Sequence, residues 1–465
     1  MIWQAYYSHR GRGPNLSGPT KAAPAVSRNS YLQLACRQVH MRFAMGIRAQ
    51  RFIVVLLTLL VITAAGCGSG PSKPQVRCAS YPTATAGTLF SGPDLGEHGY
   101  TCSYSEMNGI AYTCAAGHID IAHLRKAADW TFYLAANTAR HLEQGDTRFK
   151  FKLYEPSLYL VELTYPEDWQ NLPEQDRQYA IHDISVRLGQ YFAHIATAWH
   201  EILSWYGYRS TRLFPEFASA FSWEDSFSNL LGTHIAAIVL QNVEEFDLKD
   251  TNDFDQLMTL ALELEMEKLK IQPSRVARRA AANVRGDWYS GDLMFVDMKR
   301  RNFDIGTDDG FISPVIAPVD APECQGVQPQ AYPAPDLDFL AHYGFSIKFE
   351  VEVRDAVKNK ILQAAYPDGR NKRKRIEPSV HFARIMDHIG RQALQRYPGV
   401  GETRLAAAAA AGKIDKSSEA YFSDLTILNT AGSAAFDDQC PIEFKDLAMM
   451  SYRWLEDDPC SGQMW

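Results

Sequence analysis

The stretch IDIAHLRKAADWTFYLAANTARHL, residues 119–142, indicates the fold class, because no Pro or Gly interrupts it. Apolar residues recur along it at helical spacing, among them Ala127, Trp130 and Leu134. Arg125 and Asp129 stand four positions apart, the spacing at which opposite charges pair along a helix. The stretch therefore predicts a long α-helix.

The patterns on either side of this stretch predict more helix than strand. Alternating apolar residues predict a β-hairpin over 148–165 and one further strand over 345–353. Other helices are expected over 174–206, 226–240, 251–270, 355–365, 380–396 and 406–411. Because helices and strands do not alternate, a doubly wound sheet is disfavoured. We therefore predict a mainly α, α-rich α+β fold, with one large helical domain and a small β-hairpin or sheet element.

Composition and charge exclude several classes of protein. The 465 residues are 46% hydrophobic and 22% charged, which is ordinary for a folded chain and excludes disorder, collagen and coiled coil. No apolar run reaches the roughly 18 residues of a membrane-spanning helix, so a polytopic membrane protein is excluded. Residues 1–66 hold eight of the 47 basic residues and no acid, which leaves 39 basic and 54 acidic residues, a net −15, for 67–465. We expect no nucleic-acid partner for so acidic a body.

The N-terminal region has the pattern of a secretory signal. Arg48 and Arg51 precede an apolar run over 52–61, and small residues follow it. The ending Ala64-Ala65-Gly66-Cys67 resembles a bacterial lipobox, in which the Cys is lipidated, although Ala64 stands where Leu is usual. A plain signal peptide and a single membrane anchor are the alternatives. We predict lipid attachment, palmitate included, at Cys67, which would make the membrane a partner because each buried acyl CH₂ contributes about 0.8 kcal/mol.

The position of this signal defines the expected organisation of the chain. Met41 or Met45 would begin a signal of ordinary length. The expected segments are an upstream extension from a start assigned too early (1–40), a lipoprotein signal peptide (41–66), a flexible tether (67–90), an α-rich core domain (91–400) and a C-terminal helix with a disulfide-tied tail (401–465). An Asp at position 68 would resemble a signal for retention in the inner membrane, but this position holds Gly. We expect the bacterial cell envelope, at the periplasmic face of the outer membrane.

The cysteines of the mature chain predict disulfides, because that compartment is oxidising. Six cysteines remain after Cys36 and Cys67, and six allow 15 pairings. The expected pairs are Cys102–Cys114, Cys440–Cys460 and Cys78–Cys324. No CxxC occurs, so a zinc knuckle or a thioredoxin-like site is not expected.

Two histidines, His123 and His200, lie in sequence patterns that are compatible with metal binding or acid–base catalysis. Asp120 and His123 are three apart at a predicted helix start, so they share a face and could bind a metal or form an Asp-oriented base. A capping Asp beside a surface or core His is the alternative. His200-Glu201 begins an HExxH-like pattern, but Ser204 replaces the second His, so a zincin is rejected. His200 could still act as a ligand, or it could be a buried His that donates to a carbonyl.

Two adjacent acids could complete a site with these histidines. Glu224 and Asp225 precede a predicted helix, where they would either cap it or join His123 and His200. Antiparallel packing of successive helices would bring these ends together. The candidate catalytic residues are His123, His200, Glu201 and Asp120. The candidate metal ligands are His123, His200, Glu224 and Asp225, for a divalent ion such as zinc.

Several motifs together resemble a known family. They are Asn108–Cys114, the pattern Ile119-Asp120-x-x-His123-x-Arg125 with Ala128-Asp129-Trp130, Trp199-His200-Glu201 with Trp205-Tyr206-Gly207, Ser222–Asp225 and Arg301–Gly306. This combination resembles a family of bacterial lipoproteins known only as a domain of unknown function, over roughly residues 90–400. The resemblance implies a lipoprotein and no established activity.

Two classes of function remain open, and the sequence does not decide whether the protein is an enzyme. One is a membrane-tethered hydrolase that acts on an envelope polymer or lipid through the His/acid cluster. The other is a non-catalytic structural or binding lipoprotein, in which the same residues satisfy one another. No GxSxG elbow, P-loop or GxGxxG is present. An open cleft at the cluster would favour the first class and a closed interior the second.

Overall fold

The computed structural model describes residues 72–77, 80, 82–83, 89–210, 216–243, 246–291, 296–369 and 375–398. The expected extension over 1–40, the signal peptide over 41–66 and the tail over 401–465 lie outside these residues, as does most of the tether. No helix in the described part is long and apolar enough to cross a membrane.

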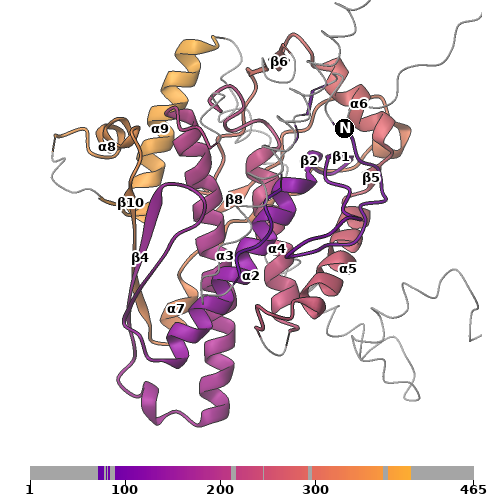
Figure 1. Ribbon diagram of the computed structural model, residues 1–465. Coiled ribbons are helices and arrows are strands. Elements are labelled where there is room, and N and C mark those ends of the chain that lie inside the picture. The colour runs from indigo at the N-terminus through magenta and orange to yellow at the C-terminus, as the bar shows by residue number, and fades with distance from the viewer. Residues whose placement is uncertain are drawn as a thin grey trace, which may run out of the picture. The chain divides into compact units, whose positions relative to one another are not determined.

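Three helices form the centre of the described part: α2 (Ile121–Glu143), α3 (Glu174–Trp205) and α4 (Asp225–Leu240). They lie side by side in Figure 1. Gly189, midway along α3, lies so close to α2 that a Cβ there would come within 2.7 Å of Ala135. Gly232 of α4 lies closer still to the main chain of α2, because a Cβ there would overlap Leu124 O. Glycine at these two positions therefore lets the three helices approach closely.

Local sequence explains where α3 begins and ends. Pro173 precedes it, and Glu174 and Asp176 in its first turn complement the positive end of the helix dipole. Gly207 follows the last turn with φ 106°, a conformation that ends helices at little cost for glycine. The predicted bounds 174–206 are confirmed to within one residue.

A four-stranded antiparallel sheet packs on one side of α3 (Figure 1). Its order is β11 (Arg375–Ile376), β10 (Ser346–Val353), β4 (Ser157–Thr164) and β3 (Arg148–Phe151). Alternate side chains of β4 and β10 are buried, and the rings of Phe349 and Phe192 of α3 are 4.7 Å apart. The predicted hairpin and the further strand are thus confirmed as neighbours in one sheet.

Smaller elements cover the other sides of the central helices. A three-stranded sheet has the order β2 (Gly117–Asp120), β1 (Ile110–Thr113) and β5 (Ile271–Gln272). Two further pairs are β6 (Tyr289–Ser290) with β7 (Asp297–Met298), and β8 (Phe311–Ile312) with β9 (Tyr332–Pro333). The remaining helices are α5 (Asn252–Lys268), α6 (Ser274–Asn283), α7 (Phe339–His342), α8 (Lys358–Ala365) and α9 (Pro378–Arg396).

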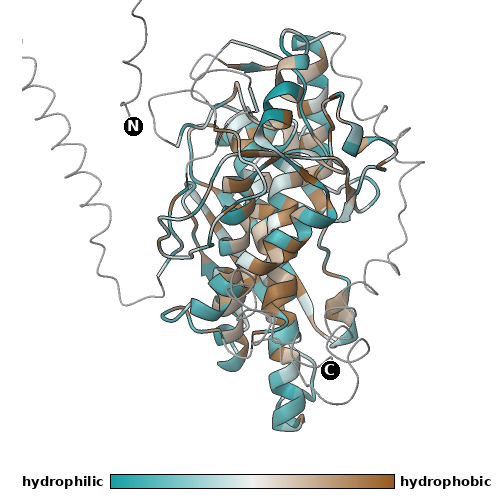
Figure 2. Cartoon of the chain, turned by 90° about the vertical axis from the view of Figure 1, so that its right-hand side faces the viewer, coloured by the Kyte–Doolittle hydropathy of each residue, from teal (hydrophilic) through white to brown (hydrophobic). Residues whose placement is uncertain are grey.

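The predicted fold class is confirmed: the described residues form a mainly α, α-rich α+β fold with small antiparallel sheets. Figure 2 shows apolar residues gathered where the helices face one another and hydrophilic residues on their outward faces. The hairpin of β1 and β2 was not predicted. Its strands have four residues each and are buried throughout, so they lack the alternation that marks a half-exposed strand.

Cys114 and Cys324 are disulfide-bonded as predicted, but the predicted partners, Cys102 and Cys78, are wrong. Cys114 and Cys324 bond to each other, with a Cα–Cα distance of 4.9 Å, although 210 positions separate them. Cys102 is exposed and holds a free thiol. Cys114 instead follows the end of β1, where the fold brings the segment around Cys324 against it. Cys78, Cys440 and Cys460 lie outside the described residues.

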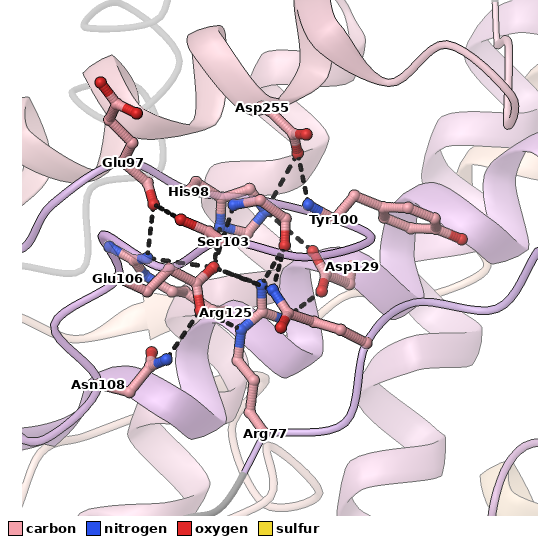
Figure 3. A network of polar contacts seen from close by, with 12 residues as sticks. Arg77, Glu97, His98, Tyr100, Ser103, Glu106, Asn108, Arg125, Asp129 and Asp255 are labelled. Atoms are coloured by element: carbon pink, nitrogen blue, oxygen red, sulfur yellow. Dashed lines mark hydrogen bonds and ion pairs between the residues drawn. The ribbon is translucent and has the colours of Figure 1, made fainter. Parts of the chain in front are cut away.

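A buried ion network fastens the first described segment to α2 (Figure 3). We call it the Arg77 clamp, formed by Arg77, Glu106, Asp129, His98 and Arg125. Arg77 Nε and Nη2 donate to the two carboxylate oxygens of Glu106 at 2.9 and 2.6 Å, and Nη1 donates to Asp129. His98 Nε2 lies 2.9 Å from the other Asp129 oxygen. Arg125 contacts Glu106 at 3.2 Å, so Arg125 and Asp129 find partners outside their own helix and the expected pair along it does not form.

Candidate functional site

The first turn of α2 begins the candidate site. Strand β2 ends at Asp120, whose carboxylate caps the helix by accepting from the amides of Ala122 at 2.8 Å and His123 at 3.3 Å. Its second oxygen accepts from the amide of Ser80 at 3.1 Å. Asp120 is fully buried, and burial raises the pKa of its carboxyl. The predicted capping role of Asp120 is therefore confirmed.

His123 lies between two carboxylates. Its Nδ1 is 3.2 Å from Asp120 Oδ2 and 3.0 Å from Asp225 Oδ1, although neither contact has hydrogen-bond geometry. Burial, with the nearby charge of Lys126, lowers the pKa of His123 to about 4, so the imidazole is neutral at pH 7. The structure thus brings together three residues that the sequence analysis singled out.

The start of α4 and the end of α3 supply three more buried acids. Asp225 accepts from the amide of Ser222 at 2.9 Å, and Glu224 accepts from the Ser222 hydroxyl at 2.6 Å. Glu201 accepts from the amide of Phe221 at 2.7 Å. Burial raises the pKa of all three carboxyls, that of Asp225 to about 6, and the charge of Asp225 raises the other two further. We call Asp120, His123, Glu201, Glu224 and Asp225 the His123 cluster.

His200, on the last turns of α3, has a different acid as its partner. Its Nδ1 lies 3.1 Å from Glu155 Oε1, and its Nε2 lies 3.9 Å from Glu216 Oε2. Burial alone would lower the pKa of His200, but the hydrogen bond to Glu155 and the charges of Glu155 and Glu201 outweigh it, so the pKa is raised. The pKa values of the two histidines are therefore shifted in opposite directions, downward for His123 and upward for His200.

Sequence reasoning missed Glu155. It lies in the turn between β3 and β4, in Tyr154-Glu155-Pro156, where no helical spacing relates it to His200. The predicted acid nearest His123 is confirmed as Asp225, whereas the acid nearest His200 comes from this hairpin. The only local signal was an acid at the turn of the one hairpin that the sequence predicted.

The site opens to solvent at its two imidazoles. The side chain of His123 is 12% exposed and that of His200 is 21% exposed, while the four acids of the His123 cluster are buried. Behind Glu201, a small cavity lined by His194, Thr197 and Asn229 has room for about one water molecule. The arrangement is therefore two partly exposed imidazoles beside a group of buried acids, which is intermediate between an open cleft and a closed core.

The predicted metal ligands are not arranged around an ion. Among the residues that the structure describes, no three His, Cys, Asp or Glu side chains are grouped so that they could hold a metal. Three of the four proposed ligands already have partners: His200 Nδ1 faces Glu155, Glu224 accepts from the Ser222 hydroxyl, and Asp225 accepts from a main-chain amide. The described residues therefore contain no preformed site for zinc or another divalent cation.

Comparison with known proteins places the whole site within one family match. No curated protein and no solved structure matches the chain. The resemblance expected over 90–400 is found over a shorter range, and it carries no statement about lipid attachment or activity. Residues 90–309, which include every side chain of the His123 cluster as well as Glu155 and His200, match the family described as Protein of unknown function (DUF4056).

Proposed function

We propose that this protein is a hydrolase of the bacterial cell envelope in which His123 and His200 act as base and acid on a bound substrate. The observation that carries the proposal is that two partly exposed imidazoles, His123 beside Asp120 and Asp225 and His200 beside Glu155, accompany a group of buried acids. They lie close enough that the charge of His200 lowers the pKa of His123. Active sites commonly place titratable groups in environments that separate their pKa values.

Each histidine has a distinct role in this reaction. With Nδ1 of His123 facing Asp120 and Asp225, its Nε2 is the nitrogen that accepts a proton from an attacking water. His200, whose Nδ1 donates to Glu155, gives the proton on its Nε2 to the leaving group as the scissile bond breaks. The water oxygen forms the new bond, and a later proton exchange with solvent restores both imidazoles.

The proposal includes a lipid anchor at Cys67 and a site of action at the periplasmic face of the outer membrane. The lipobox-like Ala64-Ala65-Gly66-Cys67 supports the anchor, and the acidic body argues against nucleic acid as a partner. An anchored hydrolase would act on an envelope polymer or on lipid. The identity of that substrate is the object of the test below.

The test compares three single variants of the purified chain. His123→Gln and His200→Gln remove the base and the acid, whereas His141→Gln removes a matched imidazole that lies 2.8 Å from Asp146 at the other end of α2. Hydrolysis is measured on a panel of chromogenic esters, phosphodiesters, glycosides and peptides. We expect each of the first two variants to lose at least about 100-fold in rate, the usual contribution of a positioned acid or base, with the control unchanged.

A structural role for the cluster is the second candidate, and a specific observation favours it. Asp120, Glu201 and Asp225 each accept main-chain amides that would otherwise be buried without partners. If the cluster only holds the fold together, His123→Gln and His200→Gln would lower stability by about 1–3 kcal/mol. No substrate would then be hydrolysed by the wild type, and the enzymatic proposal would be wrong.

A further inference from the structure

Several exposed apolar side chains of the described residues lie on segments that are neighbours in the fold. Nine large hydrophobic residues in the described part of the chain are well exposed, and five of them lie on segments that hydrogen bonds and the Arg77 clamp join to one another. These five are Val76, Leu89, Tyr104, Met107 and Tyr154, with exposed fractions from 48% to 101%. We call them the N-terminal apolar face. Single exposed apolar residues are ordinary on a soluble protein, but a group of them marks an interaction site.

Hydrogen bonds hold the segments that carry this face against one another. The amide of Gln75 donates to Tyr100 O at 2.9 Å, and the Tyr154 hydroxyl donates to Pro74 O at 2.7 Å. The amide of Ile110 donates to Leu89 O at 2.9 Å, and the Ser91 hydroxyl donates to Met107 O at 3.3 Å. The Arg77 clamp joins the segment of Val76 to that of Tyr104 and Met107 through Glu106.

The proposed lipid anchor lies a few residues from this face. Five residue steps separate Cys67 from Ser72, and at no more than about 3.6 Å each they span at most roughly 18 Å. Ser72 is fixed to the body, because its hydroxyl donates to Leu248 O at 3.2 Å and its carbonyl accepts from the Tyr100 hydroxyl at 3.0 Å. A lipid at Cys67 would therefore keep the N-terminal apolar face close to the bilayer surface.

We propose that the N-terminal apolar face docks on the headgroup region of a zwitterionic phospholipid bilayer. The proposal rests on the lipid anchor of the proposed function. Tyrosine suits this region because its ring is apolar and its hydroxyl stays hydrated, and Lys73, 5.6 Å from the centre of the Tyr154 ring, suits it likewise. A net −15 over residues 67–465 disfavours anionic lipid, so the contact depends on apolar insertion.

Docking in this way also places the candidate site near the membrane. Ser80, whose amide donates to Asp120, is four residue steps from Val76, or at most about 14 Å along the chain. The partly exposed imidazoles of His123 and His200 would then meet substrates that are themselves held at the bilayer. This narrows the substrate class to lipids and to polymers attached to the membrane.

The test uses the full chain carrying Cys67→Ser, which cannot be lipidated, and vesicles of phosphatidylethanolamine and phosphatidylcholine. Flotation measures partitioning of this chain, of a Tyr104→Ser/Met107→Ser variant and of a Tyr179→Ser/Leu394→Ser control, whose residues are also well exposed. We expect the first variant to partition roughly tenfold less, the control to match the parent, and high salt to have little effect. The proposal would be overturned if Tyr104→Ser/Met107→Ser and the control partitioned equally onto the vesicles. It would also be overturned if high salt abolished binding of the parent chain to the vesicles.

A second measurement tests the case in which the face binds the bilayer too weakly to be detected without the lipid anchor. In lipidated protein on the same vesicles, oxidation of Met107 by dilute peroxide should be several-fold slower than in the detached chain, because an exposed thioether is otherwise readily oxidised. Equal oxidation refutes the docking. Activity on soluble substrates is untouched by Tyr104→Ser/Met107→Ser, so failure of the docking and failure of the hydrolase remain distinguishable. Absence of lipid at Cys67 removes the basis of both the anchor and the docking.

Discussion

Replacing Arg77 by Met should destabilise the protein strongly. The side chains of Arg77, Glu106 and Asp129 are at most 2% exposed, so Arg77→Met would leave two buried carboxylates without their main cation. Removing one partner of a buried ion pair costs about 3–5 kcal/mol. The control is Arg148→Met, because Arg148 is 76% exposed and bonds Glu162 at the surface, where a pair contributes about 0–1 kcal/mol.

Urea unfolding at pH 7, followed by circular dichroism, measures both free energies of unfolding. Acidification supplies a second criterion. Burial alone would raise the pKa of Glu106, but the hydrogen bond and charge of Arg77 outweigh it and lower the pKa to about 2. The stabilisation is therefore complete above the ordinary pKa of 4.5 and is lost as pH falls toward 2. The difference in free energy of unfolding between wild type and Arg77→Met should therefore become smaller as the pH falls from 4.5 toward 2. A loss no greater than that of Arg148→Met, or a gap independent of pH, would refute the reasoning.

Three other predictions concern the site, the disulfide and the anchor. Glu155→Gln should lower the pKa of His200, because it removes the charged acceptor of that imidazole. The alkaline limb of the pH–rate profile should then move to lower pH, and a limb that stays in place would contradict the role of His200 as an acid. Cys114→Ala should cost about 2–5 kcal/mol in unfolding, and a non-reducing digest of wild type should contain the peptide pair Cys114–Cys324; recovery of both as free thiols would contradict this. Mass spectrometry of the mature protein should find Cys67 as a lipidated N-terminal residue, and an uncleaved peptide through that position in the membrane-bound form would count against the anchor.

The parts of the fold that follow from local periodicity were predictable. The stretch 119–142 forms a helix over Ile121–Glu143, and the first two residues differ because β2 extends to Asp120 and makes it the cap. The spacing of Asp120 and His123 predicted a shared face, and the reversal of the chain between α3 and α4 places Asp225, the first residue of α4, beside them. Each of these inferences needed only neighbours along a helix or the reversal between two helices.

The parts that depend on distant pairing were not predictable. Glu155 reaches His200 across 45 positions from a hairpin turn, and the partner of Cys114 stands 210 positions away. The close pairing Cys102–Cys114 was favoured by short loop length alone, yet the fold leaves Cys102 at the surface. Loop closure becomes only slowly more costly as loops lengthen, so proximity in sequence is a weak guide to disulfide partners.

The bond between Cys114 and Cys324 has a consequence for the survival of the protein when proteases are present. Helices α2, α3 and α4, and with them every residue of the His123 cluster, lie inside the covalent loop that this bond closes. Proteases cut exposed loops first, and the turn after α3 at Gly207 is one such place inside the loop. A single cut there would leave both pieces covalently joined and the helices packed against one another. Nicked molecules would therefore keep their site assembled, and the cut would become visible only after reduction.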